Sequence, residues 1–166
     1  STRVRSSAAS DVYKRQERWY IMKVRECMCN NVTWVKPTDS VCNCAKLMSN
    51  NHIGCIPVCD DSQNVVGIVT DRDIILRGVA CDKDAKNTPI SEIMTCKVCS
   101  CTPDTHVKEA QNMMKENQIR RIPVMENNKI VGILTLGDLA ANPDVNNSEV
   151  TNTLEDICNC NKKNAE

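Results

Sequence analysis

The chain has 166 residues, in which 21 lysines and arginines balance 21 aspartates and glutamates, and this length allows one ordinary domain or two small ones. No apolar run reaches the roughly 18 residues of a membrane span, and no charged segment leads into an apolar stretch as in a secretory signal, so we expect a cytoplasmic protein with no membrane partner. Zero net charge and the scarcity of aromatic residues, with two Trp, two Tyr and no Phe, argue against nucleic acid as a partner.

The first 21 residues differ from the rest of the chain. Residues 1–16 are rich in Ser and Arg and show no apolar period, whereas Met22 opens a patterned segment. The sequence at 17–19 can be encoded by a purine-rich stretch that resembles a bacterial ribosome-binding site. We therefore interpret residues 1–21 as a non-native leader or cloning artefact that lies outside the core. The alternative is a genuine basic arm.

Most of the remaining chain is an internal duplication. Residues of the first half recur 66 positions later in the same order: Val32, Pro37, Val41, Met48, Asn51, Ile53, Pro57 and Val58 are answered by Val98, Pro103, Val107, Met114, Asn117, Ile119, Pro123 and Val124. After one deleted residue the correspondence continues. We place repeat 1 at residues 22–84, repeat 2 at residues 85–141, and a C-terminal helix and tail at residues 142–166.

Both repeats predict the same succession of elements. An extended run precedes a proline, and an amphipathic helix, two strands and a second helix follow. In repeat 1 the polar residues 38–40 offer capping oxygens to the first helix. Val41, Cys44 and Met48 then recur at helical spacing, which indicates one buried face.

Two apolar runs, at residues 55–59 and 65–69, predict strands that are covered on both faces. A helix is expected from Thr70 to Gly78, and a polar linker at residues 80–88 leads into repeat 2. Near the C-terminus, apolar residues at helical spacing predict one short amphipathic helix. These residues are Val150, Leu154, Ile157 and Cys158.

The motif Gly-x-x-Thr-x-x-Asp occurs once in each repeat, starting at Gly67 and at Gly132. A Gly after a buried strand allows a ligand to approach the backbone closely. A Thr followed three residues later by an Asp gives the next helix an oxygen-rich first turn. An ionised Asp can accept hydrogen bonds from both ribose hydroxyls. Simple helix capping is the alternative for one such motif, but two copies in register favour a ligand site.

Together with the Ile-Pro-Val segments at 56–58 and 122–124, these motifs resemble a tandem cystathionine-beta-synthase (CBS) domain pair, or Bateman module, of the stand-alone bacterial type. The resemblance covers residues 23–140. It implies an α/β fold of the α+β type, with two β-α-β-β-α repeats packed about a pseudo-twofold axis. It also implies a regulatory homodimer that senses adenine nucleotides or related adenosyl ligands. AMP, ADP, ATP, NAD and S-adenosylmethionine are the expected candidates, with no required cofactor and an unknown regulated protein as a possible partner.

In that family each cleft takes ribose contacts from the Thr and Asp of one repeat, and adenine and phosphate contacts from the other. Carried over, the stronger site comprises Thr70, Asp73, Val98, Cys99, Ile119, Arg120 and Arg121. The weaker site comprises Thr135, Asp138, Val32, Thr33, Ile53, Gly54 and Cys55. Repeat 2 alone supplies cations, because Gly54 and Cys55 stand where Arg120 and Arg121 are found. A solvated strand end or a dimer ion pair is the alternative role for these arginines.

Twelve cysteines support a rival hypothesis, a thiol or metal-binding protein centred on Cys96, Cys99 and Cys101 or on the tail pair Cys158 and Cys160. Strand geometry argues against the first cluster, because alternate strand residues lie about 6.6 to 6.8 Å apart. We interpret most cysteines as small core residues. No catalytic triad, phosphate-binding loop or carboxylate pair is recognisable, so an enzyme is not expected. A dimerisation module with empty clefts is the third alternative.

Overall fold

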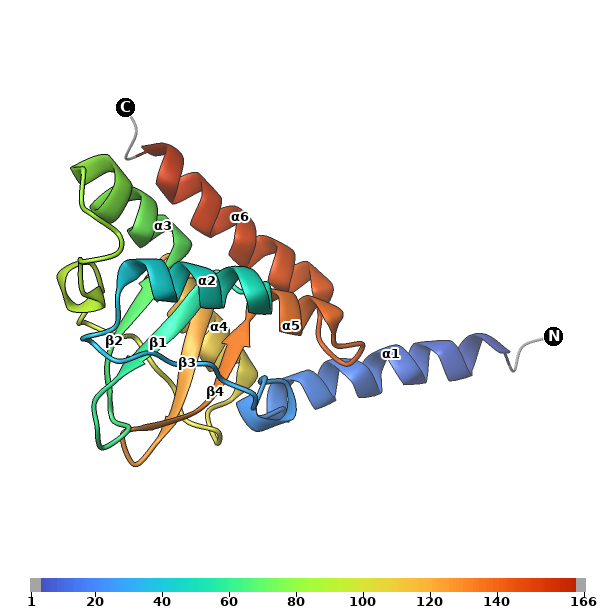
Figure 1. Cartoon of the computed structure of the whole chain (residues 1–166). Coiled ribbons are helices and arrows are strands. Elements are labelled where there is room, and N and C mark those ends of the chain that lie inside the picture. Colours follow the sequence, from blue (N-terminus) through green and yellow to red (C-terminus); the bar gives the residue numbers. More distant parts are fainter. Residues whose placement is uncertain (1–3, 164–166) are drawn as a thin grey trace. The chain divides into compact units, whose positions relative to one another are not determined.

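The computed structural model describes residues 4–163 and combines helices with two small antiparallel sheets, an α+β fold (Figure 1). Its α-helices and strands are α1 (Val4–Ile21), α2 (Val41–Asn51), β1 (Cys55–Cys59), β2 (Val65–Thr70), α3 (Asp71–Asp73), α4 (Val107–Glu116), β3 (Arg121–Glu126), β4 (Lys129–Thr135), α5 (Leu136–Ala141) and α6 (Asn147–Lys163). Backbone contacts divide the chain into two compact units. Unit 2 comprises Asn30–Ser100 and Met125–Gly132, and unit 1 comprises the remainder.

Helix α2 of unit 2 begins where its capping residues predicted. The Ser40 Oγ accepts a hydrogen bond from the Asn43 backbone N–H at 3.2 Å, which satisfies one of the first free donors of the helix. Val41, Cys44 and Met48 are buried. The predicted amphipathic helix is therefore confirmed.

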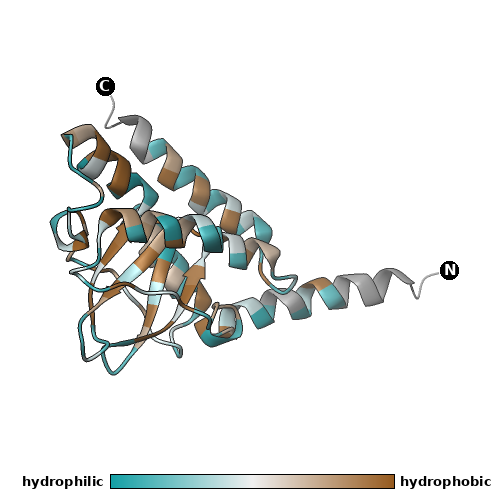
Figure 2. Cartoon of the chain, viewed as in Figure 1, coloured by the Kyte–Doolittle hydropathy of each residue, from teal (hydrophilic) through white to brown (hydrophobic). Residues whose placement is uncertain are grey.

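Strands β1 and β2 form an antiparallel hairpin that places Cys55 opposite Thr70, with an irregularity at Val58/Cys59. Every residue of β1 is buried, as expected for a near-continuous apolar run. Hydrophobic residues are concentrated in the strands in Figure 2. The predicted extended run before the proline is shorter than expected, because Val35 forms only an isolated parallel bridge with Val58.

The helix expected from Thr70 to Gly78 is irregular. It starts as the single turn α3 and continues as a π-helical turn, Ile74–Gly78, before a 3-10 turn at Val79–Cys81. Around it lies the core of unit 2. This core consists of Val35, Val41, Cys44, Met48, Ile56, Val58, Val69, Ile90 and Ile93.

In unit 1, helix α6 is attached to α4 by polar as well as apolar contacts. The buried Gln111 amide donates hydrogen bonds to the Glu149 carbonyl and the Thr153 hydroxyl, both at 2.7 Å. Val150 and Ile157 are buried, whereas Leu154 is 40% exposed. The predicted C-terminal helix is thus confirmed, but it is longer than the short helix expected, and Leu154 does not lie on its buried face.

Helix α1 contributes to the core of unit 1, contrary to the expectation that residues 1–21 lie outside it. Trp19 and Met22 are each only 2% exposed, and the Met22 N–H donates to the Arg18 carbonyl at 3.0 Å. The error arose because one buried aromatic residue produces no periodic pattern. That this segment is a non-native leader stays a prediction.

The leading segment of each repeat pairs with the second strand of the other repeat. Thr95 exchanges two backbone hydrogen bonds with Ile68, at 2.8 and 3.0 Å, and Cys29 exchanges two with Ile133, at 2.9 and 3.0 Å. Thr95 lies 66 residues after Cys29, so the two bridges occupy equivalent places in the duplication. The compact units are consequently discontinuous in sequence.

Candidate functional site

Thr70 and Asp73 form a closed turn at the point where β2 becomes α3. The Asp73 Oδ2 accepts hydrogen bonds from the Thr70 backbone N–H at 2.9 Å and from the Thr70 hydroxyl at 2.8 Å. In return, the Thr70 hydroxyl oxygen accepts from the Asp73 N–H at 3.1 Å. This reciprocal capping fixes the carboxylate. These bonds engage Oδ2 and leave Oδ1 outside the turn.

Repeat 2 has the same turn. The Asp138 Oδ2 accepts from the Thr135 N–H and from the Thr135 hydroxyl, both at 2.8 Å, and the Asp138 N–H donates back to Thr135 at 3.0 Å. Both pairs are half-buried. The capping interpretation is therefore correct for each motif, and it leaves one oxygen of each carboxylate for a further role.

Arg77 connects the Thr70 turn to the segment that leads toward Val98. Its Nη1 lies 3.6 Å from the Asp73 Oδ1 and donates to the Ile93 carbonyl at 2.9 Å. The same nitrogen is 3.2 Å from the Thr95 hydroxyl. Sequence analysis missed Arg77, although a basic residue one helical turn after an acidic one is a recognisable ion-pair spacing.

The first four residues of the expected stronger site, Thr70, Asp73, Val98 and Cys99, all belong to unit 2. Thr95 pairs with β2 next to the Thr70 turn, and half-buried Val98 and Cys99 follow along the chain. The other three residues of that site, Ile119, Arg120 and Arg121, belong to unit 1. Their association with Asp73 stays a prediction.

The residues expected at the weaker site are also divided between the units. Val32, Thr33, Ile53 and Gly54 are half-buried in unit 2. The Gly54 carbonyl accepts a hydrogen bond from the Asp71 N–H at 3.2 Å, beside the repeat 1 turn. Cys55 is only 4% exposed, which restricts any role in binding to its backbone.

In unit 1 the backbone of Arg120 lies beside the Thr135 turn, because its carbonyl accepts from the Leu136 N–H at 3.0 Å. The exposed Arg120 guanidinium reaches α6, where Nη2 is 3.6 Å from the Cys158 Sγ. This weak contact leaves the guanidinium able to take a stronger acceptor such as a phosphate.

Asn142 occupies the position after repeat 2 that is equivalent to Arg77 in repeat 1. It joins the equivalent segments through a neutral amide. Its Nδ2 donates to the Cys27 Sγ at 3.3 Å, and Cys27 corresponds to Ile93. Burial raises the pKa of the Cys27 thiol, although the Asn142 hydrogen bond opposes that rise. The two repeats thus join the same segments through a cation in one and a neutral amide in the other.

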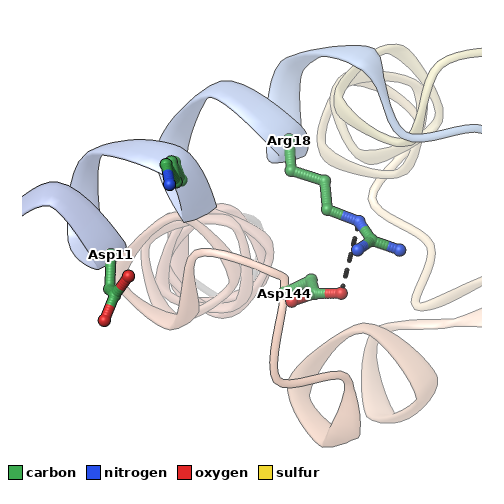
Figure 3. Close-up of a pocket in the computed structure, with 4 residues that line it drawn as sticks. Asp11, Arg18 and Asp144 are labelled. Atoms are coloured by element: carbon green, nitrogen blue, oxygen red, sulfur yellow. Dashed lines mark ion pairs between the residues drawn. The ribbon is translucent and has the colours of Figure 1, made fainter.

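Two concave regions in the described part of the chain are lined by residues other than those of the expected sites. One, of about 260 Å³, is lined by Asp11, Lys14, Arg18 and Asp144, with Arg18 Nε 3.4 Å from Asp144 Oδ2 (Figure 3). Its two cations and two anions offset one another. The other, near Val41 and Ile74, has a volume of about 30 Å³, far below the 300 Å³ or more typical of a ligand pocket.

The cysteines whose side chains the structure describes do not gather into a site, and Cys160 of the predicted tail pair lies outside them. Cys96 is exposed, Cys99 is half-buried and Cys101 is buried, and none of the three forms a disulfide. Across the described residues, no three His, Cys, Asp or Glu side chains are arranged to hold a metal ion. The predicted strand that carries Cys99 and Cys101 is reduced to one parallel bridge between Cys101 and Val124.

The two histidines lie at helix ends. His52 ends α2 in the left-handed region with a φ of 53°, and His106 precedes α4, with its Nε2 3.2 Å from the Lys23 Nζ. Both side chains are exposed.

None of the described helices is both long and apolar enough to cross a membrane.

Comparison with known proteins relates both repeats to one family. A family model of the CBS domain matches residues 24–79 and 90–143. The CBS domain-containing protein YhcV of Bacillus subtilis is 40% identical over 126 residues, which cover 75% of this chain and 88% of YhcV.

Solved structures show the same similarity. The CBS domain protein TA0289 of Thermoplasma acidophilum has a TM-score of 0.73 and 29% identity, over 81% of this chain and 75% of TA0289. The CBS domain pair of MJ0100, solved in complex with 5′-methylthioadenosine and S-adenosyl-L-methionine, has a TM-score of 0.66 and 27% identity, over 72% of this chain and 94% of that one.

Proposed function

This chain belongs to the CBS-domain family, as a tandem pair of CBS domains, and we propose that it is a regulatory module that binds an adenine nucleotide or a related adenosyl ligand. The observation that carries the proposal is the duplicated turn in which Thr70 and Thr135 hold the carboxylates of Asp73 and Asp138 by Oδ2. The adenosyl ligands of the MJ0100 pair support the same ligand class.

Each residue type has a definite task in this proposal. The Oδ1 of Asp73 or Asp138, which the threonine does not hold, accepts hydrogen bonds from ribose hydroxyls, and an ionised acceptor makes such bonds shorter and stronger. Arg120 and Arg121 supply charge to a phosphate, since the guanidinium fork suits phosphate oxygens. The half-buried Val98 and Cys99 offer apolar contact to adenine.

The proposed role is regulatory and not enzymatic. Ligand occupancy is passed on to another protein, and the chain acts in the cytoplasm as a homodimer. Ile75, Leu76 and Val79 support the dimer, because these neighbouring apolar side chains are 56%, 48% and 63% exposed. Contiguous exposed apolar groups of this kind mark interaction surfaces.

A thermal-shift panel tests the proposed ligand class. AMP, ADP, ATP, NAD, 5′-methylthioadenosine and S-adenosylmethionine are added singly, and each arm is repeated with zinc and with a chelator. A ligand present at 100 times its dissociation constant adds about 2.7 kcal/mol of stability. No response to any adenosyl compound by the folded protein overturns the proposal. A response to zinc and chelator alone supports the cysteine hypothesis instead.

A further inference from the structure

The two oxygens of the Asp73 carboxylate have different surroundings. Oδ2 is committed to Thr70, whereas Oδ1 faces the Arg77 Nη1 at 3.6 Å. The Asp73 side chain is 16% exposed and the Arg77 side chain is 50% exposed. The cation therefore acts on the oxygen that the Thr70 turn leaves available, at a place that solvent still reaches.

The guanidinium of Arg77 is itself held from the opposite side. Its Nη1 is 2.9 Å from the Ile93 carbonyl, 3.3 Å from the Met94 carbonyl and 3.2 Å from the Thr95 hydroxyl. A planar cation with several acceptors is fixed in direction and does not swing freely on its stem. Arg77 consequently orients the carboxylate and anchors the segment that leads to Val98.

Repeat 2 provides an internal comparison. The Thr135–Asp138 turn has nearly the same hydrogen-bond distances as the Thr70–Asp73 turn. Position 142, which corresponds to Arg77, is an asparagine that donates to Cys27. The two carboxylates thus share their capping geometry and differ in the group that stands one helical turn beyond.

We propose that Arg77 is a positioning residue that makes the Asp73 site selective for an intact ribose. With Oδ2 held by Thr70 and Oδ1 held toward Arg77, the carboxylate is presented to the ribose hydroxyls in one orientation. Preorganisation of this kind increases affinity by reducing the side-chain entropy that is lost on binding. The inference rests on the proposed function and adds to it the residue that sets sugar specificity in repeat 1.

Calorimetric titration of the full chain tests this inference. The probes are AMP and 5′-methylthioadenosine, each with its 2′-deoxy analogue, and the titrations are made in an Asp138→Ala background so that the Asp73 site dominates. We expect the ribose form to bind about 10-fold or more tightly than the deoxy form, because a site built for a hydroxyl rejects the analogue without it. Arg77→Asn, which copies repeat 2, should lower ribose-form affinity by about 10-fold and deoxy affinity by less than about threefold.

Asn142→Ala is the matched control and should leave the ribose preference of this site unchanged. A general loss of structure would weaken all four probes alike, so the ratio of ribose to deoxy affinity distinguishes positioning from destabilisation. If Arg77→Asn does not fold, Arg77→Lys decides the question. Its cation can still approach Asp73, and it should keep a clear ribose preference.

The failures of the two proposals are separable. If the parent protein binds none of the ribose probes, the proposed function is wrong and this inference falls with it. If the parent binds and Asp73→Ala does not, but Arg77→Asn keeps the full ribose preference, the role of Arg77 is wrong and the proposed function stands.

Discussion

Gly67 lies so close to Met94 that no side chain can be added to it without displacement. A Cβ on residue 67 would stand 2.7 Å from the Met94 sulfur and 3.2 Å from the Thr95 carbonyl oxygen. This glycine is the first residue of the Gly-x-x-Thr-x-x-Asp motif of repeat 1. Its absent side chain allows residues 93–95 to pair with β2, which in turn brings Ile93 and Thr95 within reach of Arg77.

Gly67→Ala should therefore lower the free energy of unfolding by about 1–3 kcal/mol, the usual cost of overpacking. Urea denaturation measures it. Gly78→Ala is the control, because a Cβ there meets no atom within 4 Å, and a helical Gly→Ala change is neutral or stabilising by up to about 1 kcal/mol. Equal effects of the two substitutions would contradict the close approach at Gly67.

Asp73→Asn should weaken binding of an adenosyl ligand at its site by about 2–4 kcal/mol, because charge-assisted hydrogen bonds to the ribose are lost. The amide oxygen of Asn can still accept from the Thr70 N–H, so much of the cap is retained. Calorimetry with two binding sites resolved measures the loss. Asp138→Asn carries the same change in an equivalent cap and should spare the Asp73 site. Unchanged affinity in Asp73→Asn contradicts the ribose assignment.

Cys44 should make the folded protein less stable at alkaline pH. Burial, with a smaller contribution from the charge of Asp39, raises the pKa of this thiol from 9.0 to about 11. The folded state thus holds a proton that the unfolded state releases. The stabilisation is fully present below pH 9 and is lost as pH rises toward 11, by about 2–3 kcal/mol in total.

Urea midpoints at several pH values between 8 and 11 measure this loss. The control is Cys44→Ala, which copies Ala110 at the equivalent position of repeat 2. Burial also raises the pKa of Cys27 and Cys59, so some alkaline loss remains in the variant. Identical pH profiles for the two proteins would show that Cys44 does not titrate in this way.

The exposed apolar residues after α3 should be needed for the proposed homodimer. Leu76→Glu combined with Val79→Glu should convert a dimer into a monomer in sedimentation experiments, because charges buried at an interface lose hydration. The stability of the monomer should change by less than about 0.5 kcal/mol, as for other surface substitutions. Leu154→Ser, at a single exposed leucine on α6, should leave the dimer intact. A dimer that survives the double substitution uses another surface.

Local signals in the sequence predicted the parts of the fold that depend on neighbouring residues. Ser40 as a cap, Val41 and Met48 on one helix face, and the two apolar strands were all recoverable from spacing alone. The duplication added the equivalent elements of repeat 2. It also identified the turns at Thr70 and Thr135, whose geometry is a short-range hydrogen-bond pattern.

Contacts between residues far apart in the sequence could not be predicted from local spacing. The anchoring of Arg77 by Ile93 and the bond from Asn142 to Cys27 join segments that have no local pattern in common. Trp19 was missed because its burial depends on tertiary packing. The division of the expected site residues between two units leaves the composition of each site a prediction, for which sequence spacing carries no information.

Each hairpin pairs with the leading segment of the other repeat, and the sequence separation between the paired residues differs between the two hairpins. Thr95 follows Ile68 by 27 residues, whereas Cys29 precedes Ile133 by 104. Closing the longer loop costs about 1.2 kcal/mol more in chain entropy. On the ribosome, the repeat 1 sheet gains its edge partner soon after its own strands emerge. The β4 edge, in contrast, pairs with a segment synthesised long before it, so the Thr70 turn of repeat 1 is completed first.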